Sequence, residues 1–345
     1  MASIIFTSQE DSWDLAQNEI MKTLPDSQFR KWLTRGVGIA SSPLSFDDAA
    51  LLIKERNVIF TRHIFPLEYE CSSSAWSNAI GSIAARLEEA RAKTQVQTYS
   101  IQLRILDPSL YSYSKHDLTQ WMSEDLQKRV FAPELENPDF VISAVLSDFN
   151  LYMGLSSPAQ NLSSWAGGMR RYERRPDQIS RAEFKLLEAL ETFGLDLSSL
   201  PGNKALDLGA APGGWTKVLS SKGFSVTAVD PAALSPAVLE LGNIVHAPMA
   251  AQRFLATTKG EFDLLANDMR MDASDSAKIT ASFSERLSVG GAMIMTLKLP
   301  QRKPKDAMDK ALAILRRSFS GIRAKQLFHN RSEVTVFGVK SASQK

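Results

Sequence analysis

The sequence predicts an α+β region over residues 1–160, followed by an α/β domain built on a mostly parallel, doubly wound sheet. Two observations support this prediction. In the second half, short apolar segments alternate regularly with helix-length segments, which is the pattern of a parallel sheet covered by helices on both faces. In the first half, the alternation is less regular and no glycine-rich turn occurs. With 345 residues, the chain is long enough for two or three domains.

The first half is expected to hold two small modules that meet near residue 72. Hydrophobic periodicity predicts helices over 12–23, 75–93 and 115–130, and strands over 4–7, 98–106, 140–146 and 150–155, the last two as a hairpin. We therefore expect an α+β unit at 1–72 and a second module at 73–160. The segment 161–179 is rich in Ser, Gly and Arg and is predicted to link these modules to a domain at 180–345.

The second half contains a regular series of strand candidates. They lie over 204–208, 224–229, 243–246, 262–266, 292–297, 322–327 and 334–339. The last two are joined by a short turn, so they must form a hairpin that brings an antiparallel strand into the sheet.

Composition and charge limit the function classes. Hydrophobic residues make up 44% and charged residues 23%, as in globular proteins, and the single cysteine, Cys71, cannot form an internal disulfide. No apolar run approaches the roughly 18 residues that cross a bilayer, and no signal-peptide pattern opens the chain. We expect a cytoplasmic protein without membrane contact. Four scattered histidines and one cysteine predict no structural metal.

The two halves differ in charge. Residues 1–160 carry 14 Lys and Arg against 20 Asp and Glu, whereas residues 161–345 carry 26 against 18. The second half is therefore the expected face for an anionic partner. Within it, the prolines of 297–307 predict a helix-free, flexible loop in which Arg302, Lys303 and Lys305 grip phosphates.

The strongest local signal is KALDLGAAPGGWTKVL, residues 204–219. Asp207 ends an apolar strand, a turn of small residues follows, and Trp215 opens a helix, so a ligand can approach backbone amides at the helix N-terminus. Asp230 ends the next strand, where a ribose diol would lie. This combination favours an S-adenosylmethionine site, although a nicotinamide-dependent dehydrogenase could use a similar turn.

Polar residues also follow other strands. Asp268 and Lys298 terminate two further apolar strands, and the carboxyl ends of parallel strands are where ligands bind in such sheets. The ammonium group of Lys298 should lose much of its hydration there, which would lower its pKa.

Four segments resemble the FtsJ-type ribose 2′-O-methyltransferases, most closely the RlmM branch, which modifies a cytidine of large-subunit (23S) ribosomal RNA. They are NKALDLGAAPGGWTKVL, LLANDMRMD, MIMTLKLP and QLFHNRSEVTVF. The resemblance covers about residues 161–340 and implies a Rossmann-like domain that binds S-adenosylmethionine. It also implies a catalytic tetrad of Lys185, Asp268, Lys298 and Glu333. Together with the glycine-turn signal, the predicted cofactor contacts are Ser180, Asp207, Gly209, Ala211, Pro212, Gly213, Gly214, Trp215, Asp230 and Asp268.

The first half resembles the family more loosely. PDFVISAVLSDFNLYMGLSS and NLSSWAGGMRR are similar to the end of a THUMP domain, an RNA-binding module often preceded by a ferredoxin-like unit. One departure lies in HAPMAAQRF, where the family usually places an acidic residue for the adenine and this chain has Ala250 and Ala251.

The resemblance implies RNA as the partner, most plainly 23S ribosomal RNA or a ribosome precursor. The predicted RNA contacts are Arg170, Arg171, Arg302, Lys303 and Lys305. A ribose hydroxyl is a poor nucleophile at neutral pH, so we assign Lys298 as general base, oriented by the carboxylates of the tetrad. Two alternatives stay open: the same chemistry on transfer RNA or another ribosomal nucleotide, and a catalytically silent RNA-binding or ribosome-assembly factor.

Overall fold

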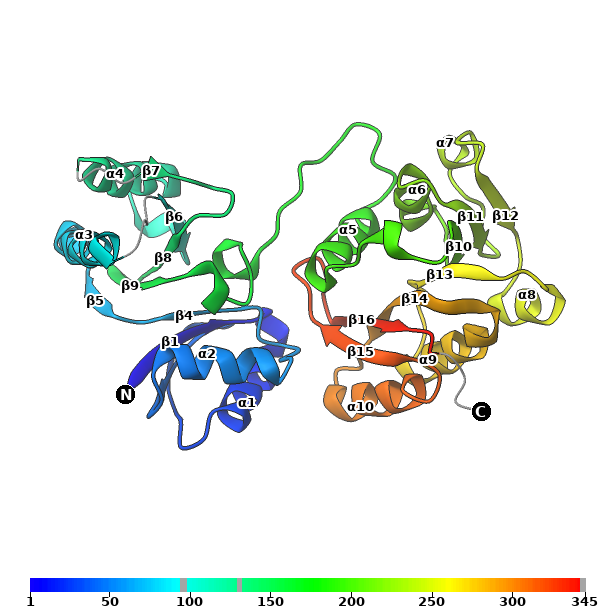
Figure 1. The fold of residues 1–345 in the computed structure, drawn as a ribbon, viewed down its shortest axis with the longest axis horizontal. Coiled ribbons are helices and arrows are strands. Elements are labelled where there is room, and N and C mark those ends of the chain that lie inside the picture. Colours follow the sequence, from blue (N-terminus) through cyan, green and yellow to red (C-terminus); the bar gives the residue numbers. More distant parts are fainter. Residues whose placement is uncertain (94–97, 129–131, 342–345) are drawn as a thin grey trace. The chain divides into compact units, whose positions relative to one another are not determined.

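A computed structural model describes residues 1–93, 98–128 and 132–341. The chain divides into two compact units, Met1–Arg170 and Arg171–Lys345. Figure 1 shows the first unit in blue to green and the second in green to red. The boundary falls inside the segment 161–179 that the sequence predicts to be a linker.

The first unit begins with a four-stranded sheet of order β2-β3-β1-β4. Strand β1 pairs antiparallel with β3 on one side and with β4 on the other. The sequence-based predictions include α1 and β1 but not β2, β3 or α2. Strand β2 has no fully buried residue and β3 consists largely of small residues, so neither shows a strong hydrophobic period. Their bounds are β1 (Ala2–Thr7), α1 (Trp13–Thr23), β2 (Gln28–Thr34), β3 (Val37–Ser42), α2 (Phe46–Glu55) and β4 (His63–Pro66).

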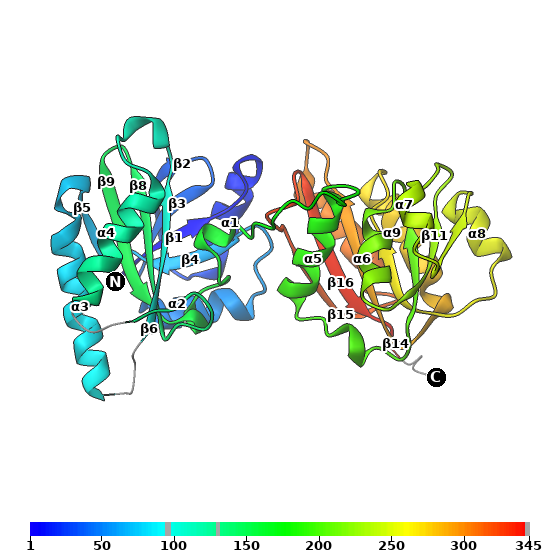
Figure 2. The same ribbon diagram turned by 90° about the horizontal axis from the view of Figure 1, so that it is seen from above.

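A five-stranded sheet of order β5-β9-β8-β6-β7 completes this unit. The predicted hairpin is present, with β8 and β9 antiparallel, and α3 and α4 cover one face of the sheet (Figure 2). Helix α4 ends three residues before the predicted 130, and residues 129 and 130 lie outside the described residues. The bounds are β5 (Tyr69–Ser72), α3 (Trp76–Lys93), β6 (Thr98–Ile105), α4 (Lys115–Gln127), β7 (Ala132–Pro133), β8 (Phe140–Ser147) and β9 (Asn150–Ser156).

The other face of the five-stranded sheet packs against the four-stranded one. Val145 and Tyr152 from β8 and β9 share a buried cluster with Ile5, Ile39 and Phe65 from the first sheet. Burying apolar side chains from both sheets makes one unit of the two modules.

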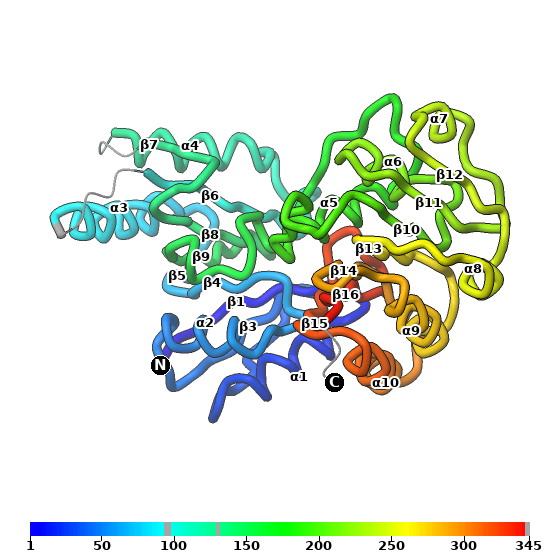
Figure 3. Tube along the Cα trace, turned by 45° about the vertical axis from the view of Figure 1, so that its right-hand side comes forward, coloured from blue at the N-terminus to red at the C-terminus, as the bar shows by residue number. Residues whose placement is uncertain are grey.

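The second unit is built on a seven-stranded sheet of order β12-β11-β10-β13-β14-β16-β15. Strands β10 to β14 run parallel, whereas β16 is antiparallel to both β14 and β15, as the short turn predicts. Helices α5 and α6 cover one face and α9 and α10 the other (Figure 1), with α9 and α10 side by side in Figure 3. The fold is thus α/β with a mostly parallel, doubly wound sheet, as predicted.

The elements of this unit follow the predicted order. They are α5 (Ala182–Phe193), β10 (Lys204–Leu208), α6 (Gly214–Ser221), β11 (Ser225–Val229), α7 (Pro236–Leu239), β12 (Ile244–Ala247), α8 (Ala251–Thr257), β13 (Phe262–Asn267), α9 (Ala273–Ser282), β14 (Leu287–Lys298), α10 (Pro304–Leu315), β15 (Ser320–Lys325) and β16 (Glu333–Val339). Ala205, Leu264 and Ile294 from the central strands pack with Trp215 and Leu186 from α6 and α5.

The prediction that prolines keep residues 297–307 free of helix is wrong from Pro304 onward. Helix α10 begins at this proline, which occupies its first turn. The first helical N–H has no partner within a helix, so a proline there removes no hydrogen bond, and its fixed φ suits the helix. Only residues 299–303 therefore remain as a loop after β14.

Candidate active site

The site lies where the strand order of the second sheet reverses. From β10 the chain proceeds outward to β11 and β12, then returns to β13 on the other side of β10. This reversal leaves a topological switch point beyond the carboxyl ends of β10 and β13, and open parallel sheets bind ligands at such points. The predicted glycine turn follows β10, and Asp268 follows β13.

The glycine turn makes close contacts that require small residues. Gly209 has φ of +74°, and a Cβ there would lie 2.9 Å from the Cα of Met269 in the loop after β13. Gly213 has φ of +111°, and a Cβ on Gly214 would lie 2.4 Å from the Ser180 hydroxyl. The turn is thus packed between the loop after β13 and the segment before α5, at the N-terminus of α6.

Asp230 joins this turn to the end of β11. Its Oδ2 accepts the N–H of Ala211 at 3.1 Å, and its Oδ1 accepts the N–H of Ala232 at 2.8 Å. Each carboxylate oxygen can accept a second hydrogen bond, so a diol can still be bound. His246 Nε2 lies 3.0 Å from the Asp230 carbonyl oxygen, which ties β12 to the same edge.

Asp207 is a buried carboxyl group. It is 1% exposed, and its Oδ2 accepts the Thr216 hydroxyl of α6 at 2.6 Å, whereas its Oδ1 has no hydrogen-bond partner among the described residues. Burial raises the pKa of Asp207 to about 7; the negative charges of Asp268 and Asp230 add to the rise, and the Thr216 hydrogen bond opposes it. Its side chain therefore lies inside the domain, behind the glycine turn.

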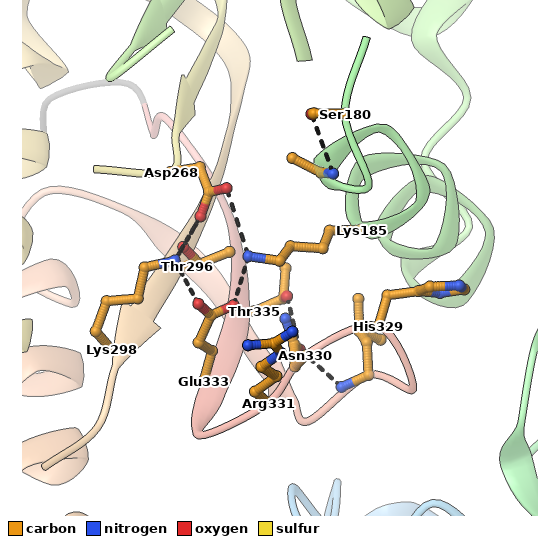
Figure 4. Close-up of polar contacts among 12 residues, drawn as sticks. Ser180, Lys185, Asp268, Thr296, Lys298, His329, Asn330, Arg331, Glu333 and Thr335 are labelled. Atoms are coloured by element: carbon orange, nitrogen blue, oxygen red, sulfur yellow. Dashed lines mark hydrogen bonds and ion pairs between the residues drawn. The ribbon is translucent and has the colours of Figure 1, made fainter. Parts of the chain in front are cut away.

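The four tetrad residues come together in a closed ring of alternating charge (Figure 4). Lys298 Nζ lies 2.6 Å from Asp268 Oδ1 and 2.7 Å from Glu333 Oε1. Lys185 Nζ lies 3.5 Å from Asp268 Oδ2 and 2.7 Å from Glu333 Oε2, the latter an ion pair without hydrogen-bond alignment. The side chains are 16 to 22% exposed, so the ring is shielded yet reachable.

Each tetrad residue comes from a different element. Lys185 lies on α5, Asp268 follows β13, Lys298 ends β14 and Glu333 starts β16. Lys298 and Glu333 are directly opposite each other in the antiparallel pair of β14 and β16, which brings their side chains within reach.

The expectation of a lowered Lys298 pKa is wrong for this state of the protein. Burial of the amine does act to lower its pKa, but Asp268 and Glu333 outweigh burial and raise the pKa above its ordinary value. Burial likewise acts to raise the pKa of Asp268, yet Lys298 and Lys185 hold it below its ordinary value. Both groups are therefore charged at neutral pH.

Two supporting residues were not predicted. Thr296 accepts a hydrogen bond from Lys298 Nζ at 2.9 Å and donates one to Asp268; it lies two residues before Lys298 and so on the same face of β14. Glu188 accepts the backbone N–H groups of Phe328 and His329 in the turn before β16, and it lies three residues after Lys185, on the same side of α5. Strand and helix periodicity are the signals that point to these positions.

Other predicted cofactor residues lie around the turn. The Ser180 hydroxyl accepts the N–H of Ala182 at 3.2 Å, and its own N–H is bound by Glu183, which stabilises the start of α5. The Trp215 indole is buried and donates to the Ala182 carbonyl at 2.8 Å, tying α6 to α5. Ala250 directly precedes α8, which begins at Ala251.

The five residues predicted to contact RNA lie in different parts of the structure. Arg170, in the first unit, stacks its guanidinium over the Trp165 ring at 4.0 Å, and Arg171 begins the second unit. Arg302 and Lys303 are exposed in the loop after β14. Lys305 lies on α10 and pairs with Asp309 at 2.6 Å. Their contact with RNA stays a prediction.

Among the helices of residues 1–93, 98–128 and 132–341, none is long and apolar enough to cross a membrane. Within the same residues, no group of three or more His, Cys, Asp or Glu side chains is placed to hold a metal ion.

Several known proteins match this chain over part or nearly all of its length. A protein of Halorhodospira halophila (strain DSM 244 / SL1) named "Ribosomal RNA large subunit methyltransferase M" is 35% identical over 181 residues, which cover 52% of each chain. A protein of the same name from Azoarcus sp. (strain BH72) is 30% identical over 231 residues, which cover 64% of this chain and 62% of the relative. The chain thus spans about half the length of the first relative. TrmN from Thermus thermophilus matches 99% of this chain and 100% of its own at 13% identity, with a TM-score of 0.38.

The family model agrees with the geometry of the site. It is described as FtsJ-like methyltransferase and matches residues 178–324. That range contains the glycine turn, Asp230 and three members of the charged ring. Residues 178–324 therefore form an FtsJ-like methyltransferase domain.

Proposed function

We propose that this protein transfers a methyl group from S-adenosylmethionine to a ribose 2′-oxygen of large-subunit ribosomal RNA. The observation that carries the proposal is the ring of Lys185, Asp268, Lys298 and Glu333 beside a glycine turn at the switch point of the sheet. The FtsJ-like match and the likeness to large-subunit ribosomal RNA methyltransferases support it.

The residues around the turn fit the proposed cofactor. Asp230 offers free acceptor capacity for a ribose diol, and residues 209–214 carry no side chain larger than that of proline, so a ligand can approach the backbone of the turn. Ser180 contacts the same turn beside Gly214. When bound, the cofactor supplies an activated methyl group and a positive charge on sulfur.

The tetrad is suited to the proton of the ribose hydroxyl. Lys298 is the proposed base, and its amine is held by Asp268, Glu333 and Thr296, so its direction is set before substrate binds. To accept a proton, the amine must first lose one. The amine of Lys298 would lose that proton more readily with the positively charged cofactor bound, whereas Asp268 and Glu333 oppose the loss.

The proposal also names a target nucleotide and a role for the first unit. A cytidine of 23S ribosomal RNA is the proposed target, either in naked RNA or in a ribosome precursor. The first unit, with its THUMP-like segment, is proposed to present RNA to the site, together with Arg170, Arg171, Arg302, Lys303 and Lys305. Such a protein would work in the cytoplasm.

Two measurements test the function. Purified protein with labelled S-adenosylmethionine and large-subunit ribosomal RNA should transfer label to a ribose 2′-oxygen. Mapping of ribose methylation in the host, with and without the gene, should then show one site lost. Transfer to transfer RNA alone would move the substrate to another class, and the absence of transfer to any RNA would favour a silent assembly factor.

A further inference from the structure

The tetrad itself attracts no phosphate at long range. Lys298 and Asp268 are both charged at neutral pH, and each lysine in the ring lies between two carboxylates. Two ammonium groups and two carboxylates sum to zero charge. A polyanionic substrate that reaches this ring must therefore be held by cations outside it.

Three loops surround the tetrad at the carboxyl edge of β13 and β14. In the sheet order β13-β14-β16, the loop after β13 carries Arg270, the loop after β14 carries Arg302 and Lys303, and the turn before β16 carries Arg331. All four side chains are exposed, and within the described residues none forms an ion pair with a carboxylate. Arg270 and Arg331 are not among the RNA contacts that the sequence predicts.

The turn that carries Arg331 is held on several sides. Glu188, 5% exposed on α5, accepts the N–H groups of Phe328 and His329 at 2.8 and 2.9 Å. Asn330 Oδ1 accepts the Leu327 N–H at 2.8 Å. The carbonyl of Arg331 accepts a hydrogen bond from Gln326 at 3.2 Å, and the next carbonyl, that of Ser332, accepts the Leu299 N–H. The backbone of Arg331 is thus fixed two residues before Glu333 (Figure 4).

Arg270 lies in the loop after β13, whereas Arg331 lies in the turn before β16; these two strands flank β14, which ends at Lys298. It lies two residues after Asp268, and its neighbour Met269 donates its N–H to Asn267 at 2.9 Å and packs on Gly209. Only β14 lies between β13 and β16, so two inter-strand spacings of about 4.8 Å place the ends of these strands roughly 10 Å apart. Arg270 and Arg331 therefore lie two residues in sequence from Asp268 and Glu333, on either side of β14.

We propose that Arg331 and Arg270 bind the phosphates on either side of the ribose that the tetrad methylates. A guanidinium presents two parallel N–H groups to a phosphate, which fixes position as well as supplying charge. Because the turn of Arg331 leads directly into Glu333, a phosphate bound there places the neighbouring ribose with respect to the tetrad. The inference rests on the proposed function, because it takes RNA as the substrate.

The test compares Arg331→Gln and Arg270→Gln with the parent protein. Each change should weaken RNA binding about tenfold, equally for ribosomal and unrelated RNA, and should lower the slope of log affinity against log salt by about one. Arg331→Lys keeps the charge but not the paired donors, so it should keep the salt slope and recover only part of the affinity. Methyl transfer at limiting RNA should fall in parallel.

Arg317→Gln is the matched control. Arg317 is an exposed arginine just after α10, at the opposite edge of the sheet, and forms no ion pair among the residues that the structure describes, so its loss should leave affinity and salt slope unchanged. Unaltered calorimetric binding of S-adenosylhomocysteine would show that each variant is folded. A parent that binds and methylates RNA, with Arg331→Gln and Arg270→Gln behaving like Arg317→Gln, overturns this inference alone. A folded parent that methylates no RNA overturns the proposed function instead.

Discussion

Two effects act on the pKa of Lys298 in opposite directions, the desolvation of its amine and the attraction of Asp268 and Glu333. In the structure the carboxylates prevail and the amine keeps its proton. A base that must first lose a proton gives a rate that rises with pH, so the pH profile of methyl transfer reports the protonation of this amine in the loaded protein.

Lys298→Met should abolish most turnover. The change removes the amine and keeps the approximate length of the side chain, so the single-turnover rate should fall by about 10² to 10⁴ while cofactor affinity survives. Lys298→Arg should not restore the rate, because a guanidinium stays protonated. A robustly active arginine variant, or a parent rate independent of pH, would leave Lys298 as an orienting group only.

Asp230→Ala should weaken S-adenosylmethionine binding. Loss of hydrogen bonds from a ribose diol to a charged acceptor costs roughly 1.5 to 3 kcal/mol, or about 10- to 150-fold in dissociation constant. Isothermal titration calorimetry measures this directly. Because Asp230 also binds the N–H groups of Ala211 and Ala232, circular dichroism is needed to show that the variant is folded. Unchanged affinity would remove Asp230 from the cofactor site.

Asp207 should make the second unit less stable as pH rises. Its folded pKa of about 7 exceeds the ordinary value of 3.8, so between these pH values the folded state holds a proton that the unfolded state lacks. The free energy of unfolding therefore falls as pH rises from about 4 to 7. Asp207→Asn should match the parent near pH 4 and be more stable by roughly 1 to 4 kcal/mol at pH 8 in denaturant unfolding. Equal pH dependence in both proteins would contradict the raised pKa.

At the scale of elements, α5 and the turn before β16 act together. Lys185 binds Glu333, and one turn farther along the helix Glu188 binds the backbone of Phe328 and His329 and the His329 ring at 2.8 Å. One helix thus contributes a member of the tetrad and also holds the turn that leads to another. This arrangement fixes the distance between α5 and β16 without a further side chain in the site.

Glu188→Ala should destabilise the second unit and slow methyl transfer. The change removes the acceptor of two backbone N–H groups at half-buried residues, at a cost of about 1 to 3 kcal/mol each. Glu188→Gln keeps one acceptor oxygen and should lose about half as much. Unfolding in urea measures the free energy of unfolding of both variants. If the alanine variant were as stable as the parent, water would be satisfying these donors and the turn would not depend on Glu188.

At the scale of the whole molecule, each of the two units has hydrophobic clusters of its own. Residues of the first unit fill two clusters, around Leu146 and around Phe65, and residues of the second unit fill others, around Ile294 and around Val238. The charge difference between the halves of the sequence follows the same division, so the site lies in the more basic unit.

Separate cores predict two unfolding transitions in differential scanning calorimetry. S-adenosylhomocysteine at about 100 times its dissociation constant should stabilise only the unit that binds it, by about 2.7 kcal/mol. For a unit of this size that corresponds to roughly 5 to 10 °C. The unfolding transition of the first unit should keep its midpoint temperature. A single transition that shifts as a whole would mean that the two units unfold cooperatively.

The sequence by itself determined the order of strands and helices in the second unit, the C-terminal hairpin, the glycine turn and the four charged residues that meet in the ring. These features depend on local periodicity, turn chemistry and motif, which are properties of short segments. The tertiary structure decided the rest. Burial and pairing depend on distances in the folded chain, so only the structure revealed that Lys298 keeps its proton and that Lys305 is paired with Asp309. The structure also shows that Arg331 and Arg270 form no ion pair within the described residues, near a ring without net charge. Strands β2 and β3 belong to the same class, because partners in the sheet stabilise them where their own sequence has little preference.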